Sequence, residues 1–341
     1  MGISLANGRA VQSMSPVLFV EDQKRFLTRM DRNYRYKYER IRKLLESDSF
    51  TTVDIGGISS NLDPSLYAIL LVGVFAVFPL RTDPPDWRVP PAWFHKINTC
   101  CVILEDLWPR PDRSLAEILG NKYQYLISTY DCDDLAQLRK RLPSVRKTYV
   151  IPHHIDTELY KERGLPKIYD VLLYGNTKPE RYPFRNRLRR LLASSHLNVR
   201  IIEHPGAPVF DEERCSEGLA RIINQSEISI ATPSVGDYLV AKYFEISGAG
   251  SVVAGKMAAQ GRPIWKEHYV QLEEDMSDLE ILGRLTAALK DKDSLRRKGE
   301  LMRQVVRQEY SLDRYIERFT AVLQDICASR AGGNGNRTLC H

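Results

Sequence analysis

The sequence GDYLVAKYFEISGAGSVV, from Gly236 to Val253, carries the pattern that most constrains the fold. It predicts a short helix, Leu239–Ile246, that ends in a Gly-Ala-Gly turn before an apolar strand. Asp237 and Glu245 are eight residues apart, and Lys242 shares a helix face with Glu245 by the i, i+3 rule. Such a carboxylate can accept hydrogen bonds from the vicinal hydroxyls of a ribose, and the lysine can meet a phosphate. The alternative interpretation is a surface amphipathic helix with a glycine C-cap.

Apolar segments of strand length alternate with helical patterns on both sides of this stretch. Most of them are continuously apolar, which is typical of parallel strands that helices cover on both faces. The pattern therefore predicts an α/β protein with two doubly wound parallel sheets and a ligand cleft between them. We expect strands at residues 18–22, 51–56, 69–78, 100–106, 123–128, 148–152, 170–176, 198–205, 227–233, 251–255 and 268–272.

The length of 341 residues agrees with two domains. We place the first domain at residues 1–158, because the polar stretch 153–167 separates two cycles of strands and helices. The second domain is expected at 159–330, with helices from Ser277 to Ala328 that close it and cross back to the first. The tail, residues 331–341, is rich in glycine and asparagine and is predicted to be disordered.

Composition excludes several protein classes. A hydrophobic content of 43% rules out a disordered chain, and a net charge of +6 is a weak field for a chain of this size. The six cysteines form no C-x-x-C pair, so neither a zinc site nor a thioredoxin-like motif is expected. The longest apolar run, Ala68–Leu80, is shorter than the ~20 residues that span a bilayer. The N-terminal residues show no secretory pattern, and we expect a cytoplasmic protein.

A basic loop follows the strand at 170–176. Gly175 allows close approach of the backbone to a ligand, and Lys178, Arg181 and Arg185 bring cations to the start of the next helix. Each of these cations, taken alone, is equally typical of solvated surface charge. Their order, with strand, basic loop and helix before Glu245, favours an anion-binding role.

The string from Lys242 to Val253 resembles the nucleotide-binding signature of GT-B glycosyltransferases, and more closely the C-terminal domain of their spore-maturation-protein-like branch. The spacing of Asp237 and Glu245 is similar to the E-x7-E motif of that superfamily, with Asp in place of the first Glu, which leaves the role of Asp237 open. Residues 169–192 are similar to the strand, glycine and "YP-x-R" helix that open the family's donor domain. The resemblance spans roughly residues 148–320.

This resemblance implies a GT-B fold of two Rossmann-like domains and a nucleotide-sugar donor, with a UDP-sugar favoured. Glu245 would bind the ribose of the donor. The diphosphate would be neutralised by side-chain cations, namely Lys178, Arg181, Arg185 and Lys242. GT-B enzymes handle the leaving diphosphate with cations and helix dipoles, so the resemblance implies neither a metal nor another cofactor.

Two carboxylates, Glu105 and Asp106, stand at the carboxyl end of the strand at 100–106, where α/β domains place active-site groups. The segment from Ile103 to Pro109 resembles the matching strand end of phage DNA β-glucosyltransferases. That resemblance implies that Asp106 deprotonates the acceptor hydroxyl in an inverting transfer, with Glu105 as the second choice of base. In the alternative, Asp106 caps the following turn. A retaining transferase also stays open, because retaining members share the eight-residue acidic spacing.

Two further motifs lie near the expected cleft. His153 and His154 follow the strand at 148–152, and adjacent side chains of an extended chain point to opposite sides, so they are poor partners for one metal. One of them is a candidate contact to the diphosphate or the sugar. Asp131-Cys-Asp133 contains a D-x-D string, which we interpret as the N-cap and first turn of a helix in preference to a metal site.

The segment Lys24–Lys43 combines nine basic residues with three tyrosines. It predicts either an outer helix of the first domain or a helix that binds an anionic surface. The sequence does not identify the acceptor, and the candidates are a glycan, a small molecule, a protein and modified DNA. The second hypothesis is a non-catalytic module with the GT-B fold that binds a polyanion through this segment.

Overall fold

The computed structural model describes most of the chain from residue 115 onward and parts of it before. Glu105, Asp106 and the basic segment Lys24–Lys43 lie outside the described residues, so the predictions made for them stay predictions. The described residues are 16–21, 50–55, 62–73, 89, 91–97, 99–104, 107, 115–203 and 216–333.

The first sheet, within these ranges, has six strands, all paired in parallel. Its order is β2-β1-β3-β4-β5-β6, so the chain first builds to one side of β1 and then crosses to the other. Every residue of β1, β3, β4 and β5 is buried, as expected for strands covered on both faces. The strands are β1 (Val17–Glu21), β2 (Phe50–Asp54), β3 (Ile69–Val72), β4 (Cys100–Leu104), β5 (Tyr125–Ser128) and β6 (Lys147–Val150).

The second sheet repeats this topology with five described strands in the order β11-β10-β9-β7-β8, again parallel throughout. Its first strand, β7, lies between β8 and β9, and the strand order therefore reverses between β7 and β9. The strands are β7 (Tyr169–Gly175), β8 (Val199–Glu203), β9 (Ser226–Ile230), β10 (Val252–Gly255) and β11 (Val270–Gln271).

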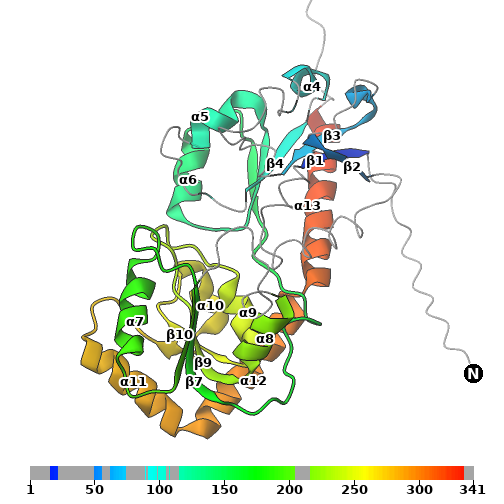
Figure 1. The fold of residues 1–341 in the computed structure, drawn as a ribbon. Helices are drawn as coiled ribbons and strands as arrows, with labels where there is room; N and C mark the ends of the chain where they lie inside the picture. The colour runs from blue at the N-terminus through cyan, green and yellow to red at the C-terminus, as the bar shows by residue number, and fades with distance from the viewer. Residues whose placement is uncertain are drawn as a thin grey trace, which may run out of the picture.

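Helices cover both faces of each sheet (Figure 1). On the first sheet, α4 to α6 pack on one face. On the second, α8, α9 and α12 share a core on one face, while α7 and α11 share a core on the other. The helices are α4 (Pro91–Lys96), α5 (Leu115–Leu119), α6 (Asp133–Lys140), α7 (Pro183–Ala193), α8 (Ser216–Asn224), α9 (Lys242–Gly248), α10 (Arg262–Trp265), α11 (Asp278–Lys290), α12 (Lys292–Glu309) and α13 (Leu312–Gly333).

The last helix, α13, returns to the first sheet and covers its second face (Figure 1). Phe319, Leu323 and Ile326 are buried against residues of β1 to β5. At the rim of this contact, Asp325 accepts hydrogen bonds from Lys147, at 2.7 Å, and from the Tyr149 hydroxyl. This packing confirms the expectation that the C-terminal helices cross back to brace the first domain. The boundary at residue 158 stays a prediction.

The α/β class with two parallel sheets is confirmed, and all eleven expected strands are present. The largest difference is in the strand expected at 69–78, since β3 ends at Val72. Two differences concern helices. The helix expected from Leu239 begins only at Lys242, and the residues before it, Tyr238 and Leu239, are buried in different cores. At the C-terminus, α13 continues to Gly333, since an established helix propagates easily over a few poor helix formers.

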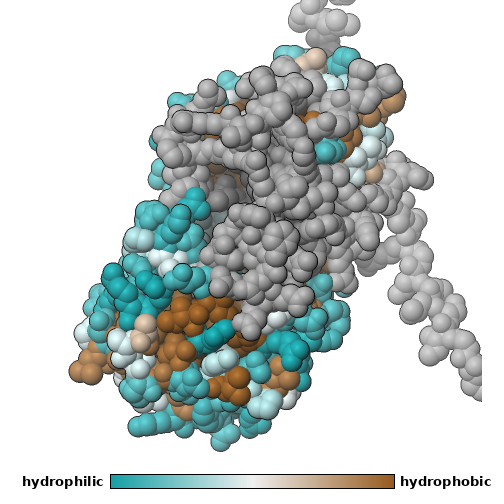
Figure 2. All heavy atoms as spheres, in the orientation of Figure 1, coloured by the Kyte–Doolittle hydropathy of each residue, from teal (hydrophilic) through white to brown (hydrophobic). Residues whose placement is uncertain are grey.

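Hydrophilic side chains cover most of the described surface of the second domain, with an apolar area among them (Figure 2). Among the large apolar side chains, Val235 on the loop after β9 is 55% exposed. No helix in the described part of the chain is both long enough and apolar enough to cross a membrane.

The contact between α13 and the first sheet gives a stability prediction. Leu323→Ala should lower the free energy of unfolding by about 2–5 kcal/mol, because it leaves a cavity between helix and sheet. Gln324→Ala, at an exposed position of the same helix, should change it by less than about 0.5 kcal/mol. Urea unfolding of both variants measures the difference, and equal losses would contradict the packing of α13 on the sheet.

Candidate functional site

The reversal of strand order between β7 and β9 creates the crevice in which open α/β sheets bind ligands. Gly175 ends β7 at this crevice with φ +90°, a conformation that only glycine adopts at low cost. A Cβ atom at this position would stand 2.6 Å from Lys242 Nζ. The glycine is therefore required both by its backbone conformation and by the place that the lysine occupies.

Lys242, the first residue of α9, is 8% exposed and points at the end of β7. Its Nζ donates a hydrogen bond to the carbonyl oxygen of Tyr174 and lies 3.9 Å from the centre of the Tyr174 ring. Burial lowers the pKa of Lys242 well below its usual value, and the nearby charge of Arg185 lowers it further, while Glu245 opposes the change. The ammonium group is thus held where its charge is poorly compensated.

Arg185, in the first turn of α7, is the second buried cation of the site and is 2% exposed. Nη1 donates to the carbonyl oxygen of Asn176 at 3.1 Å and Nη2 to that of Thr232 at 2.6 Å. The guanidinium group also lies 4.0 Å from the centre of the Tyr182 ring. Burial lowers the pKa of Arg185, yet a guanidinium stays protonated at any physiological pH. Arg185 therefore ties the ends of β7 and β9 together and keeps its charge there.

Glu245 lies one turn along α9 from Lys242, and 7% of it is exposed. Its Oε2 accepts a hydrogen bond from the Tyr174 hydroxyl at 3.1 Å. Tyr174 thus contacts both predicted residues, Lys242 through its ring and carbonyl oxygen and Glu245 through its hydroxyl. The structure brings Gly175, Lys242 and Glu245 together around this tyrosine, and Arg185 of α7 binds the loops that follow β7 and β9.

Several buried polar atoms at the same edge have no hydrogen-bond partner among the described residues. They are Arg185 Nε, Thr232 Oγ1 and Ser234 Oγ, and the side chains of Arg185 and Thr232 are almost fully buried. A buried polar atom without a partner costs about 1–3 kcal/mol. Their grouping at the ends of β7 and β9 is typical of a site that a polar ligand completes.

Asp237 stands apart from this group. It has a positive φ of +54°, and its Oδ2 accepts a hydrogen bond from the backbone N–H of Ala259 at 2.9 Å. The carboxylate thus holds the loop after β9 against the segment after β10. The contact gives Asp237 a structural role, whatever else it does with a ligand.

Lys178 and Arg181 lie on the loop between β7 and α7. Lys178 is exposed, and its backbone N–H donates to Asn176 Oδ1 at 2.9 Å. Arg181 is half-buried, and its carbonyl oxygen accepts from the backbone N–H of Val235 at 3.0 Å. The loop that carries both cations is therefore joined to the loop after β9, which keeps them at the rim of the crevice.

The two histidines point in different directions, as the sequence predicts. His153 Nε2 lies 3.2 Å from the Tyr130 hydroxyl, next to the contact between the two sheets' loops. His154 is buried and packs on the ring of Tyr315 in α13, with 4.2 Å between the ring centres. His154 is therefore part of the attachment of α13, and His153 is the one nearer the crevice.

Asp133 lies in the first turn of α6, as the interpretation of the D-x-D string predicts, but the N-cap is Cys132 and its side chain makes no capping bond. Asp131, the first residue of the D-x-D string, therefore does not cap this helix. Within the described residues, no group of three or more histidine, cysteine, aspartate or glutamate side chains is arranged to hold a metal ion.

Sequence reasoning did not single out Tyr174, Thr232 or Ser234. A signal was present for the last two, because Thr232-Pro-Ser234 directly follows β9 at the carboxyl edge of the sheet. No sequence signal marks Tyr174, which is one of several apolar residues of β7.

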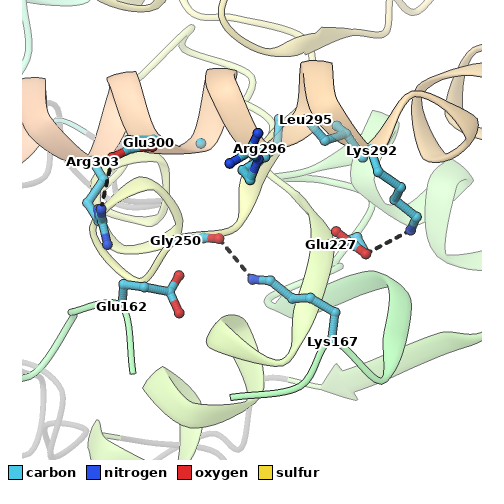
Figure 3. A pocket seen from close by; sticks show the side chains of 11 residues that line it. Glu162, Lys167, Glu227, Gly250, Lys292, Leu295, Arg296, Glu300 and Arg303 are labelled. Atoms are coloured by element: carbon cyan, nitrogen blue, oxygen red, sulfur yellow. Dashed lines mark hydrogen bonds and ion pairs between the residues drawn. The ribbon is translucent and has the colours of Figure 1, made fainter. Parts of the chain in front are cut away.

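A cavity of about 540 Å³ lies at the opposite, amino-terminal edge of the second sheet, under α12 (Figure 3). Most of its charged groups are bound to one another or to the backbone. Lys167 Nζ donates to the carbonyl oxygens of Asn224, Ser226 and Gly250, and Lys292 forms an ion pair with Glu227 at 2.7 Å. These contacts tie the starts of the strands together, and we interpret the cavity as structural.

The chain is similar to solved structures of glycosyltransferases at 10–12% sequence identity. Anabaena HepE in complex with UDP-glucose matches with a TM-score of 0.64, over 91% of this chain and 100% of HepE, at 11% identity. T4 phage BGT in complex with UDP and Mn²⁺ matches with a TM-score of 0.58, over 90% and 99%, at 12% identity. Sucrose-phosphate synthase from Thermosynechococcus elongatus matches with a TM-score of 0.56, over 92% and 100%, at 10% identity.

These likenesses establish the fold, which is the expected GT-B fold with its two Rossmann-like domains. No protein-family model and no curated protein matches the chain.

The burial of Lys242 gives a prediction for stability against pH. Because its pKa in the folded protein is below the unfolded value of about 10.4, the unfolded chain binds more protons between the two values, and stability rises with pH there. Lys242→Met removes the titrating group and with it this dependence of stability on pH. The variant should unfold at a higher temperature than the native protein near pH 7, and the difference should shrink as the pH approaches about 10.

The control is Lys256→Met, which removes a lysine from a partly exposed ion pair with Glu274 and should give no such stabilisation. Thermal unfolding at a series of pH values measures both. A Lys242→Met protein that is less stable than the native one at every pH would contradict the burial of an undercompensated charge.

Proposed function

We propose that this protein is a glycosyltransferase that moves a sugar from a nucleoside diphosphate donor, with UDP favoured, to a hydroxyl group of an acceptor. The observation that carries the proposal is the pair of buried cations, Lys242 and Arg185, beside Glu245 at the switch point of the second sheet. The fold supports it, because HepE and BGT, which share it, were solved with UDP-glucose and with UDP.

The donor would lie across the carboxyl ends of β7 and β9. Glu245 would accept hydrogen bonds from the two ribose hydroxyls, and Tyr174 already orients this carboxylate. Lys242 and Arg185 would face the diphosphate, with Lys178 and Arg181 at the rim. The two negative charges of the diphosphate would supply the compensation that the buried cations lack.

The polar atoms without partners support the same placement. Arg185 Nε and Thr232 Oγ1 can each donate a hydrogen bond to a phosphate oxygen, and Gly175 leaves the backbone open to close approach. The site thus has donors ready for the charge that develops on the leaving diphosphate.

For the chemical step, we infer that Asp106 is the general base of an inverting transfer. Its carboxylate takes the proton of the acceptor hydroxyl as that oxygen bonds to the anomeric carbon. The bond between this carbon and the diphosphate oxygen breaks, and the electron pair leaves with the diphosphate. Because side-chain cations meet that charge, we propose that the transfer needs no metal. We also propose that the sugar is a hexose, as in the UDP-glucose complex of HepE.

We infer that the acceptor binds to the first domain. A cavity of about 240 Å³ between α5 and α6 supports this, since it is lined by Leu107, which directly follows Asp106, and by Asp134 at the start of α6.

The string from Lys242 to Val253 supports membership of the second domain in the spore-maturation-protein-like branch.

A variant of Glu245 tests the donor site. Glu245→Ala should weaken UDP binding by about 10- to 100-fold, because two hydrogen bonds to a charged group are lost. Glu300→Ala, on α12 at the cavity of the opposite edge, should bind UDP as the native protein does. Isothermal titration calorimetry in the presence of a chelator measures both and also tests the independence from metal. Equal affinities for the two variants would contradict the assignment of Glu245.

Calorimetry also separates the enzyme from the polyanion-binding module. If the native protein binds none of UDP, GDP and ADP but binds heparin or DNA, with an affinity that falls steeply with salt, the proposed function is wrong.

A second variant tests the base. Asp106→Asn keeps the shape of the side chain but cannot take a proton, so turnover of the donor found by a screen of nucleotide sugars should fall by about 100- to 10,000-fold, with UDP affinity unchanged. Glu105→Gln is the control and should retain most of the activity. Full activity of Asp106→Asn would overturn the assignment.

A further inference from the structure

Tyr238 belongs by sequence to the loop after β9 in the second domain, but its side chain is buried in the core of the first. It is 3% exposed. The next residue, Leu239, is buried in the core of the second domain, and Val240 packs against both cores. We call residues 231–241, which join β9 to α9, the donor loop. The donor loop is thus fastened into both halves of the molecule.

The contacts of Tyr238 are specific as well as apolar. Its ring is stacked on that of Tyr130, with 4.6 Å between the ring centres and 17° between the planes. Its hydroxyl donates a hydrogen bond to Asp134 Oδ2 at 2.6 Å. Asp134 lies in the first turn of α6 and also lines the cavity between α5 and α6. One side chain therefore joins the donor loop to the part of the first domain in which we place the acceptor.

A second contact runs parallel to the first. Gln260, from the turn after β10, accepts a hydrogen bond from the backbone N–H of Asp131 at 3.2 Å and donates to the carbonyl oxygen of Thr129 at 3.4 Å. On the far side of Tyr130, the His153 ring packs edge-on, with its centre 5.4 Å from that of Tyr130. The loop after β5 is held by the second domain and by the chain that crosses between the domains.

The backbone of the donor loop is shaped for this contact. Gly236 lies so close to the first domain that a Cβ atom there would stand 2.9 Å from Asp134 Oδ2. Asp237 takes its positive φ directly before Tyr238, and its bond to Ala259 fixes the turn. A non-glycine residue in this conformation carries strain, which persists only where the surroundings impose it. Here the surroundings are the bond to Ala259 and the burial of Tyr238 in the core of the other domain.

The donor loop runs without a break into the candidate donor site. The backbone N–H of Glu245 donates to the carbonyl oxygen of Ala241, and that of Tyr243 donates to Val240. The last residues of the loop are therefore part of the first turn of α9, which carries Lys242 and Glu245. A displacement of Tyr238 relative to the first domain would be passed to these two side chains.

We propose that Tyr238 is a positioning residue for the transfer reaction: it fixes the donor loop to the wall of the acceptor side, so that α9 and the acceptor cavity keep one relative position. The inference rests on the proposed function for the identity of the two sites. The attachment itself is a property of the protein without ligands.

Hydrogen exchange followed by mass spectrometry, on the full chain without ligand, tests the attachment. Tyr238→Ala should speed amide exchange by about tenfold or more both in the donor loop and in residues 129–136 of the first domain. Tyr238→Phe, which keeps the stacking and loses only the bond to Asp134, should have a smaller effect in the same two segments. If Tyr238→Ala does not fold, Tyr238→Phe and Asp134→Ala carry the test.

Tyr243→Phe is the matched control, since it also removes one tyrosine hydroxyl bond, to the carbonyl oxygen of Lys256 within the second domain. It should leave exchange in residues 129–136 unchanged. Unchanged exchange there in the Tyr238 variants would overturn the proposal, and so would an equal increase in Tyr243→Phe.

Kinetics separate positioning from mere stability. In Tyr238→Phe, UDP affinity and KM for the donor should stay within about twofold of the native values, while kcat for sugar transfer falls by about tenfold. A parallel loss of UDP affinity would contradict a positioning role. If the native protein binds no nucleotide, the proposed function fails, and the exchange experiment still decides whether Tyr238 joins the two domains.

Discussion

Two positive charges, those of Lys242 and Arg185, are buried together at the carboxyl end of β7, and the second domain is arranged around them. Charges are rarely buried without a counter-charge. Among the described residues, the groups that offset these two positive charges are backbone carbonyl oxygens, tyrosine rings and one carboxylate, that of Glu245. The carbonyl groups come from the ends of β7 and β9, the two strands at which the sheet order reverses. Such an arrangement lowers the stability of the free protein, and an anionic ligand, such as the diphosphate of the proposed donor, would offset this cost.

The relation between the two domains rests on two different contacts. Helix α13 packs its apolar side chains on one face of the first sheet, along β1 to β5, and this makes the helix part of the first domain's core. The donor loop makes a smaller contact at the crevice, through Tyr238 and its partners Tyr130 and Asp134. The first contact provides stability at a distance from the crevice. The second lies beside the proposed chemistry, where a misplacement of about 1 Å can lower the rate by about 100-fold.

Much of the fold could be predicted from the sequence, because strands buried in a parallel sheet consist of continuous apolar residues. Strands such as β7 and β10 can be recognised from their apolar runs alone. Gly175, Lys242 and Glu245 could be assigned to one site through the resemblance to GT-B glycosyltransferases, and the structure places them together. The sequence does not show that Lys242 and Arg185 are buried. It also does not show that Tyr238 enters the other domain. The burial of the two cations and the position of Tyr238 depend on contacts between segments far apart in the chain. A local pattern of polar and apolar residues does not reveal such contacts.

The central claim is that the buried cations receive the diphosphate of a nucleotide. A crystal structure of the protein with UDP tests this most directly. We predict that the β-phosphate lies within hydrogen-bond distance of Lys242 Nζ, with the ribose hydroxyls on Glu245 and a phosphate oxygen on Arg185 Nε. A nucleotide bound in the cavity under α12, or one whose phosphates contact neither Lys242 nor Arg185, would contradict the account.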